Sequence, residues 1–321
     1  MVSVSIVIPT FNRKKYLKKT IESIFSQTVL PDEIIVSDNA STDGTLEYLA
    51  TQNQITINAH ASQVSMFSNW VDAFSLSTKE YVVLLSDDDI LGKDFVESIH
   101  NAGKSAEYAL IIGKHGYITE DDIYMPEELS IKNITSGIIE ATTFINIVRM
   151  GVPFRTCGVA FNRKLLFGID LKQLASNYLY TAFDSEIIQR VGILGNSFIL
   201  ESKKPLVYYR VWNNSLTSKT ILCTQWHDEI FLWMNHFSEY ARVILSPKEI
   251  RKCINMVRFQ NVKTAFSVLR SKKFEYSDYK NLYSILSEIK PSNWFMLLYY
   301  LKTWLLRLRI IRLIFGYLEK A

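Results

Sequence analysis

Three consecutive carboxylates follow an apolar run in the first third of the chain. Asp87, Asp88 and Asp89 follow Val82–Leu85, with only Ser86 between them. Adjacent ionised carboxylates repel one another unless a cation or a positively charged ligand group offsets the repulsion. Mg²⁺ and Mn²⁺ take carboxylate oxygens as ligands and commonly bridge phosphates. The run therefore indicates a Mn²⁺ or Mg²⁺ site beside a diphosphate more than a solvated loop.

Two further polar segments stand at the ends of apolar runs. Pro9–Arg13 follows Ser3–Ile8, and Asp38–Thr45 follows Glu33–Val36. If the apolar runs are parallel strands, all three polar segments meet at one edge of a sheet, where such sheets bind ligands. Taken alone, the second segment also reads as a turn with Ser41 as a helix cap.

Two common nucleotide-binding motifs are absent from the sequence. Residues 1–91 contain a single glycine, Gly44, so no GxGxxG follows the first apolar run, and no GxxxxGK occurs anywhere. These absences disfavour a dinucleotide-binding domain and a P-loop NTPase.

The elements that must position these residues alternate between strands and helices over the first 112 residues. The predicted order implies an α/β fold whose sheet is mostly parallel, with helices on both faces. The predicted strands are Ser3–Ile8, Glu33–Val36, Ile55–Ala59, Tyr81–Leu85 and Ala109–Ile112, and the helices are Lys14–Ser26, Thr42–Ala50, Val64–Leu76 and Gly92–Asn101.

The pattern is weaker from residue 113 onwards. Residues 113–140 give no clear prediction. After about residue 220 the pattern is purely helical, and Ser246–Glu249 is a typical helix start. Between these regions we predict a helix over Ala141–Met150, a strand over Thr156–Phe161, a helix over Asp184–Val191 and a strand over Pro205–Val211.

The three polar segments together resemble the motifs of the family 2 glycosyltransferases of GT-A fold, of the bacterial surface-polysaccharide type. The resemblance rests on Ile6–Arg13, Val36–Thr45 and Leu84–Asp89, in the family's order and approximate spacing. It implies a GT-A catalytic domain over residues 1–218, in which residues 1–112 bind the nucleotide sugar and residues 113–218 form the acceptor side. Residues 219–321 lie outside the resemblance and are expected to form a helical C-terminal region.

The resemblance also implies roles for individual residues. Asp38 would bind the base, Asp87 would approach the ribose, and Asp89 would hold Mn²⁺ or Mg²⁺ on the diphosphate, with Asp87 as a second metal candidate. The residues expected to bind the nucleotide-sugar donor are Pro9, Thr10, Asn12, Arg13, Asp38, Asn39, Asn69, Asp87, Asp88, Arg210 and Trp212.

A carboxylate base is expected at the start of a later helix, and Asp184 aligns with it. The family has a glutamate-aspartate pair there, whereas this chain has Phe183 before Asp184. A helix N-terminus favours the ionised, proton-accepting carboxylate. The alternative is that Asp184 is merely a helix N-cap, and Glu186 is the second candidate. The resemblance implies a single inverting displacement, but retention stays open because the stereochemistry rests on analogy alone.

The strand ending at Tyr209–Arg210 also fits the family, except that Trp212 stands where a histidine is common. Tryptophan has no ring-nitrogen lone pair for a metal, but it can stack on a sugar or close the site. Arg210 either faces phosphate or packs its stem in the interior. Arg155 and Thr156 are weaker candidates for the acceptor side.

Charge is distributed unevenly along the chain. Residues 290–321 carry six basic side chains and one acidic, or +5, and the other residues carry 30 basic and 31 acidic, or −1. A near-neutral body argues against nucleic acid as the partner. Three cysteines, far apart and odd in number, fit a reduced compartment better than a disulfide framework or a zinc site.

The basic tail points to a local partner. Trp294–Phe315 is rich in aromatic and apolar residues but is interrupted by four cations, so it is too charged to span a membrane. Such helices lie in the membrane interface. We therefore predict a cytoplasmic enzyme that is peripheral on the inner face of the cell membrane and acts on a saccharide or lipid-linked acceptor. The alternative is that this helix packs on the protein body.

Two other functions remain as alternatives at this point. A nucleotidyltransferase would need a basic phosphate loop near the N-terminus, and Asn12–Lys15 is poor for that purpose. A catalytically silent sugar-binding scaffold with the same fold would have no need of the Asp87–Asp89 run or of Asp184.

Overall fold

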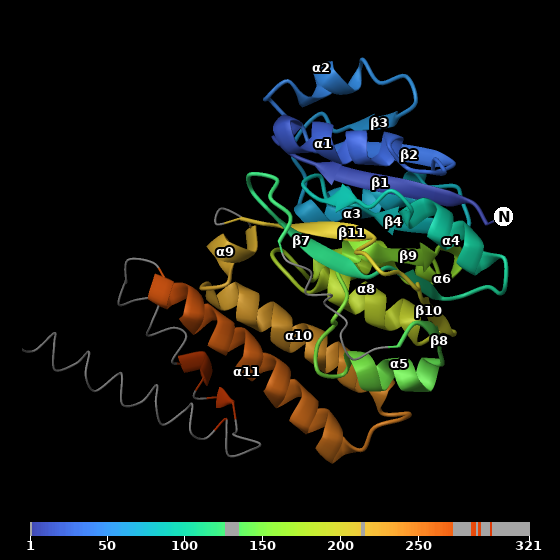
Figure 1. Ribbon diagram of the computed structural model, residues 1–321. Helices are drawn as coiled ribbons and strands as arrows, with labels where there is room; N and C mark the ends of the chain where they lie inside the picture. The colour runs from blue at the N-terminus through green and yellow to red at the C-terminus, as the bar shows by residue number, and fades with distance from the viewer. Residues whose placement is uncertain are drawn as a thin grey trace, which may run out of the picture. The chain divides into compact units, whose positions relative to one another are not determined.

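The computed structural model describes residues 2–125, 135–212, 216–271, 284–286, 288–289 and 296. The chain divides into two compact units, Met1–Leu216 and Thr217–Ala321. Each unit is described by itself below, and Figure 1 shows the course of the chain through both.

The first unit is built on a large, mostly parallel sheet, as the sequence predicts. Within the described residues its strand order is β3-β2-β1-β4-β9-β6-β10-β8. β9 and β8 run antiparallel to their neighbours, and the other strands share one direction. The strands are β1 (Val4–Thr10), β2 (Glu33–Asp38), β3 (Thr56–Ala59), β4 (Tyr81–Leu84), β6 (Leu110–Ile112), β8 (Gly137–Ile139), β9 (Val159–Asn162) and β10 (Ser197–Ile199).

The central strands are mostly apolar and buried along their whole length because helices cover both faces of the sheet. Every residue of β1 and of β4 is buried. Ile6 and Ile8 pack in one core with α1 (Lys14–Phe25) and α4 (Phe95–Gly103). The opposite face of β1 and β2 carries α3 (Met66–Leu76), as Figure 1 also shows.

The remaining helices of this unit are short. They are α2 (Thr45–Leu49), α5 (Ala141–Val148), α6 (Arg163–Leu166), α7 (Leu171–Ser176) and α8 (Phe183–Gly192). Of these, α8 packs on β6 and β9, so it brings the predicted base toward the centre of the sheet.

A second, smaller sheet was only partly predictable. It contains β5 (Ile90–Leu91), β11 (Val207–Val211) and β7 (His115–Thr119), with β11 in the middle. β11 pairs antiparallel to β5 and parallel to β7. This pairing puts Arg210 of β11 beside the segment that follows β4, although the two are more than a hundred positions apart in sequence.

Two local predictions were wrong. The helix predicted from Thr42 begins at Thr45, and its N-cap is Gly44 at φ +83°, not Ser41. The Ser41 hydroxyl instead accepts the Asn12 backbone N–H, and Asp43 accepts the Thr45 N–H. The strand predicted over Thr156–Phe161 begins as a 3₁₀ turn, η1 (Thr156–Gly158), before β9.

The second unit is helical in its described residues, as predicted. α10 (Thr224–Ala241) and α11 (Pro247–Ser271) pack against each other, and α9 (Leu216–Thr220) spans the boundary between the units. The Ser246 hydroxyl and the Glu249 carboxylate exchange hydrogen bonds with each other's backbone N–H at the start of α11, which confirms the predicted capping box.

The predicted membrane-interface helix, 294–321, lies outside the described residues except for Met296. Among the helices that the structure describes, none is both long enough and apolar enough to cross a membrane.

Candidate active site

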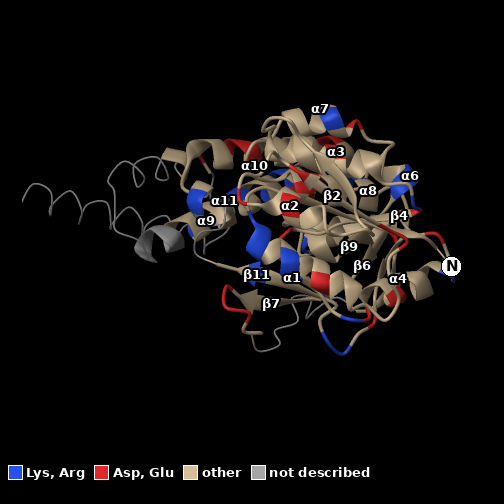
Figure 2. Cartoon of the chain, turned by 90° about the horizontal axis from the view of Figure 1, so that it is seen from above, with Lys and Arg blue, Asp and Glu red and all other residues tan. Residues whose placement is uncertain are grey.

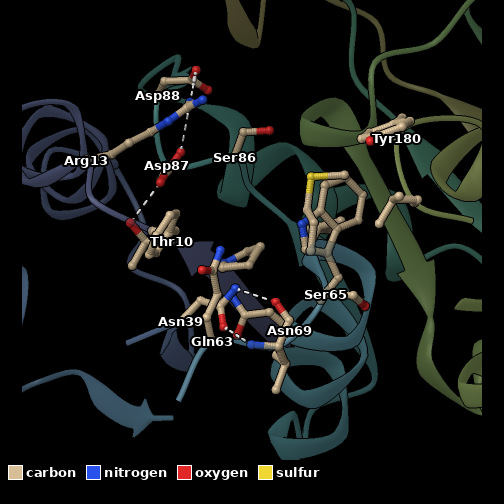
Figure 3. Close-up of a pocket in the computed structure, with 17 residues that line it drawn as sticks. Thr10, Arg13, Asn39, Gln63, Ser65, Asn69, Ser86, Asp87, Asp88 and Tyr180 are labelled. Atoms are coloured by element: carbon tan, nitrogen blue, oxygen red, sulfur yellow. Dashed lines mark hydrogen bonds and ion pairs between the residues drawn. The ribbon is translucent and has the colours of Figure 1, made fainter. Parts of the chain in front are cut away.

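A cavity of about 550 Å³ lies at the carboxyl ends of β1, β2 and β4. Its lining includes seven of the predicted donor-binding residues: Pro9, Thr10, Arg13, Asn39, Asn69, Asp87 and Asp88. The three polar segments therefore meet at one edge of the sheet. Figure 3 shows Arg13 and the two aspartates on one side of this space and Tyr180 on the other.

Asp87 is buried, and both of its carboxylate oxygens accept a hydrogen bond. The Thr10 hydroxyl donates to its Oδ2 at 2.7 Å, and the Arg13 guanidinium lies 3.3 Å from its Oδ1 (Figure 3). Burial raises the pKa of Asp87 to about 7, with Asp88 adding to the rise and Arg13 opposing it. A second cation near this carboxylate would favour its ionised form.

Asp88 receives two donors on a single oxygen. Both the Arg13 guanidinium and the Trp212 indole N–H, the latter at 3.2 Å, bind its Oδ2. The guanidinium carbon of Arg13 also lies 4.9 Å from the centre of the Trp212 ring. Trp212, which stands where the family often has histidine, thus closes over Arg13 and Asp88.

Asp89 is the most deeply buried of the three, at 1% exposure. The Arg210 backbone N–H donates to its Oδ1 at 2.8 Å, so the small sheet fixes this carboxylate. Burial, with a further contribution from Asp88, raises the pKa of Asp89 to about 8, although the nearby Cys157 thiol and Ser86 hydroxyl favour the ionised form. Its Oδ2 has no hydrogen-bond partner among the described residues.

These donors fit a hard divalent cation in part. The free Oδ2 of Asp89 is a suitable ligand atom. In the part of the chain that the structure describes, however, no three His, Cys, Asp or Glu side chains converge on one point. Diphosphate oxygens and water would have to supply the remaining ligands, as is usual for Mg²⁺.

Arg210 serves the architecture of this edge. Its side chain is buried, and it donates to the Asp88 carbonyl at 2.7 Å, to the Thr119 carbonyl at 2.8 Å and to Asp122 at 2.8 Å. It therefore ties the end of β7 to the segment after β4. Of the two predicted roles for Arg210, packing and cross-linking is the one that these contacts support.

Asp38 is buried beneath the cavity lining. Its Oδ2 accepts the Ser41 N–H at 2.9 Å, while Oδ1 has no partner within the described chain. Neighbouring Asn39 exchanges two hydrogen bonds with the backbone of Val64 and so anchors the loop before α3. Asn12, at φ +52°, accepts the Thr42 N–H outside the cavity lining.

Asn69 joins a buried polar network as well as the cavity wall. Its side-chain oxygen accepts from the Ser37 hydroxyl at 2.6 Å and lies 3.1 Å from His60 Nε2. Its amide donates to the Ser37 carbonyl at 3.0 Å. These contacts fix the position of α3 on β2, so Asn69 shapes the cavity through packing.

Asp184 lies in the first turn of α8, one residue after the first helical residue, and the N-cap is Ala182. Because Ala182 is the N-cap, the alternative that Asp184 is the N-cap is wrong. The Asp184 side chain is half-buried. The Thr156 hydroxyl of η1 donates to its Oδ2 at 3.1 Å. Because Cys157, the next residue, lies against Asp89, η1 links the predicted base to the predicted metal ligand.

The structure does not bring Glu186 and Arg155 to the cavity lining. Glu186 is completely buried, and its carboxylate is held by Tyr178 and by Arg190, which lies 2.7 Å away. The exposed Arg155 stacks its guanidinium 4.7 Å from the centre of the Tyr209 ring.

Residues 5–167, about half of the chain, match the family model described as Glycosyl transferase family 2. The chain belongs to this family. The resemblance found in the sequence motifs is thereby confirmed.

Two curated relatives of this family 2 chain come from bacteria. TarP of Staphylococcus aureus, named a poly(ribitol-phosphate) beta-N-acetylglucosaminyltransferase, is 32% identical over 124 residues, which are 36% of this chain and 37% of TarP. The abequosyltransferase RfbV of Salmonella typhimurium is 36% identical over 98 residues, 28% of this chain and 29% of RfbV. The matched segment spans about a third of each relative.

Solved structures share the fold. S. aureus TarS residues 1–349, in complex with UDP-GlcNAc, superposes with a TM-score of 0.65 at 15% identity, covering 89% of this chain and 80% of that one. A mannosyltransferase from Pyrobaculum calidifontis, in complex with GDP-Man and Mn²⁺, gives a TM-score of 0.50 at 16% identity, covering 97% and 86%. At this identity the likeness shows the fold alone, and it confirms the predicted GT-A architecture.

Several cavity residues of the family 2 chain were not predicted. They are Phe11, Gln63, Val64, Ser65, Met66, Trp70, Leu84, Ser86, Leu179 and Tyr180. Phe11, Leu84 and Ser86 lie within the motifs that carry the resemblance, and their position there was the available signal. Most of the others are apolar or small, and their local sequence does not separate a cavity wall from ordinary packing. Of these, Tyr180 carried the best available signal, because it precedes the predicted base by four residues.

Proposed function

We propose that this chain transfers a sugar from a nucleoside-diphosphate sugar to a saccharide hydroxyl, in the synthesis of a bacterial surface polysaccharide. One observation carries the proposal. Asp87 and Asp88 line the cavity at the strand ends, Asp89 is buried directly after them, and η1 links Asp89 to Asp184 through Cys157 and Thr156.

On the donor side, the nucleotide would occupy the cavity between β1, β2 and α3. Asp38 is proposed to bind the base on the family resemblance; its Oδ1 has no partner among the described residues, but it is buried outside the cavity lining. Asn39 holds the loop whose residue Val64 lines the cavity. Arg13 lines the same cavity and supplies the positive charge that a diphosphate needs.

A divalent cation, Mn²⁺ or Mg²⁺, would be held by Asp89 through its free Oδ2, with Asp87 or Asp88 as a further ligand. When bound, it supplies Lewis-acid stabilisation of the leaving diphosphate. Burial of Asp89 and Asp87 means that ionising both carboxylates is costly without such a cation.

Asp184 would act as the general base. It removes the proton from the acceptor hydroxyl, and the acceptor oxygen forms a bond to the anomeric carbon as the bond from that carbon to the diphosphate oxygen breaks. The diphosphate leaves with the electron pair, and a single displacement inverts the configuration. Thr156 donates to Oδ2 of Asp184 and the Ser185 backbone N–H donates to Oδ1 at 2.7 Å, so each oxygen keeps one further lone pair for the acceptor hydroxyl.

The acceptor is proposed to be a saccharide, lipid-linked in the cell, that reaches Asp184 from the side formed by residues 113–218. The basic tail, 290–321, would hold the enzyme at the inner face of the membrane by attraction to anionic lipid. Deleting residues 292–321 should move the protein from the membrane fraction to the supernatant. An unchanged membrane fraction would contradict this part.

The test of the function is sugar-nucleotide turnover. With Mn²⁺ and a panel of nucleotide sugars pre-screened by thermal shift, the wild type should release nucleoside diphosphate, and Asp89→Ala should lose at least ~100-fold of that rate. Asp94→Ala is the matched control. Asp94 lies five residues further along the chain, is exposed, and makes no side-chain capping hydrogen bond. No turnover in the wild type, or equal turnover in Asp89→Ala, would refute the proposal.

The same assay decides against the silent scaffold. A sugar-binding protein without catalysis would show donor-dependent thermal shifts but no nucleoside diphosphate release in any variant. Family membership and the placement of Asp184 favour the enzyme.

A further inference from the structure

Arg13 already supplies a positive charge to two of the three carboxylates in the acidic run. Its guanidinium contacts Asp87 at 3.3 Å and also binds Asp88, and its own side chain is about one quarter exposed. Two carboxylates of the acidic run are therefore neutralised by a residue of the chain itself.

Trp212 holds this arrangement closed. Its indole N–H donates to the same Asp88 oxygen that Arg13 binds, and its ring covers the guanidinium. The Tyr16 ring also lies 5.6 Å from the Trp212 ring, centre to centre. We call this group, consisting of Arg13, Asp87, Asp88 and Trp212, the arginine clamp.

The clamp also explains why the acidic run does not already form a metal cage. In the part of the chain that is described, no three acidic, His or Cys side chains converge on one point. The Asp88 oxygen that a cation would need is turned toward Arg13 and Trp212. A divalent cation and the guanidinium therefore compete for the same carboxylates.

We propose that Arg13 is an internal cation that exchanges partners during donor binding. Its guanidinium moves from Asp87 and Asp88 to the diphosphate, and Mn²⁺ or Mg²⁺ takes its place beside the carboxylates. Arg13 lines the donor cavity, so a small rotation of its side chain keeps it beside the ligand. Without donor, Arg13 weakens metal binding by occupying the carboxylates. Without metal, the carboxylates weaken nucleotide binding by holding Arg13. Each ligand thus promotes the other, as linkage requires.

The inference rests on the proposed function, but its test needs no turnover. Mn²⁺ binding is measured by electron paramagnetic resonance of free Mn²⁺, and UDP binding by calorimetry in the presence of a chelator. Arg13→Ala should bind Mn²⁺ alone about tenfold more tightly than the wild type, since a competing charged hydrogen bond is gone. The same variant should bind UDP alone about tenfold more weakly, because the cationic partner of the diphosphate is gone.

Tighter Mn²⁺ binding together with weaker UDP binding distinguishes loss of the arginine clamp from misfolding and from a general loss of positive charge. A misfolded variant loses both affinities. General loss of positive charge is controlled by Lys18→Ala. This variant removes an exposed lysine of α1, a helix whose basic positions are drawn in blue in Figure 2. Lys18 lies over the Tyr48 ring and, within the described part of the chain, makes no ion pair with the acidic run. Lys18→Ala should leave both affinities within twofold of the wild type.

A second variant tests the Trp212 part of the clamp. Trp212→Phe keeps the aromatic cover but removes the indole N–H, so Mn²⁺ alone should bind about threefold more tightly, in the same direction as Arg13→Ala.

Two results would overturn the inference. If Mn²⁺ binding is unchanged or weaker in Arg13→Ala while the wild type binds both Mn²⁺ and UDP, the clamp is wrong and the proposed function survives. If the wild type binds neither Mn²⁺ nor UDP, both are wrong.

Discussion

On the donor side of the candidate active site, Asp87 and Asp88 share the guanidinium of Arg13, and Asp89 is buried against the backbone of β11. On the proposed acceptor side, Asp184 is half-buried and accepts two hydrogen bonds, from the Thr156 hydroxyl and from the Ser185 backbone N–H, with no cation among these partners. The donor side is a dense charge network in a low-dielectric setting, where each group depends on its neighbours. The acceptor side leaves a single carboxylate open to a partner. Under the proposed function, the carboxylates that bind the donor must be held by cationic and backbone partners, whereas the carboxylate that accepts the proton must be reachable by the acceptor.

The largest effect is expected from removing the base. Asp184→Asn should lower the transfer rate by about 10³-fold, since general base catalysis typically contributes 10²–10⁴. The amide keeps the shape and can still accept from Thr156, so the thermal melting temperature should change little. If the variant retains more than a tenth of wild-type transfer in a steady-state assay, Asp184 is not the general base and the contrast between the two sides is wrong.

A slightly smaller effect is expected from Asp89→Asn, and it should depend on pH. Because burial raises the pKa of Asp89 to about 8 and of Asp87 to about 7, wild-type Mn²⁺ affinity should rise as pH increases from 6 to 8. Asp89→Asn should lower transfer by about 100-fold and flatten this profile. A pH-independent Mn²⁺ affinity in the wild type would contradict the role of these carboxylates.

The same pKa shifts predict a stability change in the metal-free protein. Between about pH 4 and pH 8 the folded state holds protons on Asp87 and Asp89 that the unfolded chain has released. The unfolded state then binds fewer protons, so the free energy of unfolding falls as pH rises. Calorimetric melts of Asp89→Asn should show a shallower fall, by up to ~1.4 kcal/mol per pH unit. An identical slope in both proteins would show that Asp89 is not the group responsible.

A moderate effect is expected on the acceptor side from Thr156→Val. This substitution removes the hydroxyl that orients Asp184 while keeping the branched shape, so kcat should fall about tenfold with the donor KM unchanged. A rise in donor KM at constant kcat would instead place Thr156 on the donor side.

The smallest effect on transfer is expected from Glu186→Gln. Glu186 is buried and is bound by Tyr178 and Arg190 rather than facing the cavity. The change should leave transfer within about twofold but lower the melting temperature by several degrees, because a buried ion pair loses one partner. A loss of transfer without a loss of stability would restore Glu186 as an acceptor-side residue.

The difference between the two sides also explains what the sequence could reveal. The strands of the donor half are continuous apolar runs that end in polar segments, so β1, β2, β4 and the convergence of Thr10, Asp38 and Asp87 were predictable. Parallel-sheet topology alone brings such ends together.

What could not be predicted depends on contacts between distant segments. β7 and β11 pair in parallel across about ninety residues, and neither pattern names its partner. In the Arg13–Asp88–Trp212 group, the large sheet brings Arg13 and Asp88 together, but Trp212 joins them through β11 of the small sheet. Serine is a common helix cap, but the Ser41 hydroxyl accepts the Asn12 backbone N–H instead. The N-cap is Gly44, at positive φ, and the helix begins at Thr45.

The central claim is that the charge that binds donor lies on one side and the proton acceptor on the other. Calorimetric titration of UDP in the presence of Mn²⁺ into Asp89→Asn and Asp184→Asn tests it most directly. The claim predicts wild-type affinity in Asp184→Asn and a loss of about tenfold or more in Asp89→Asn. Equal losses in both variants, or a loss in Asp184→Asn alone, would contradict it.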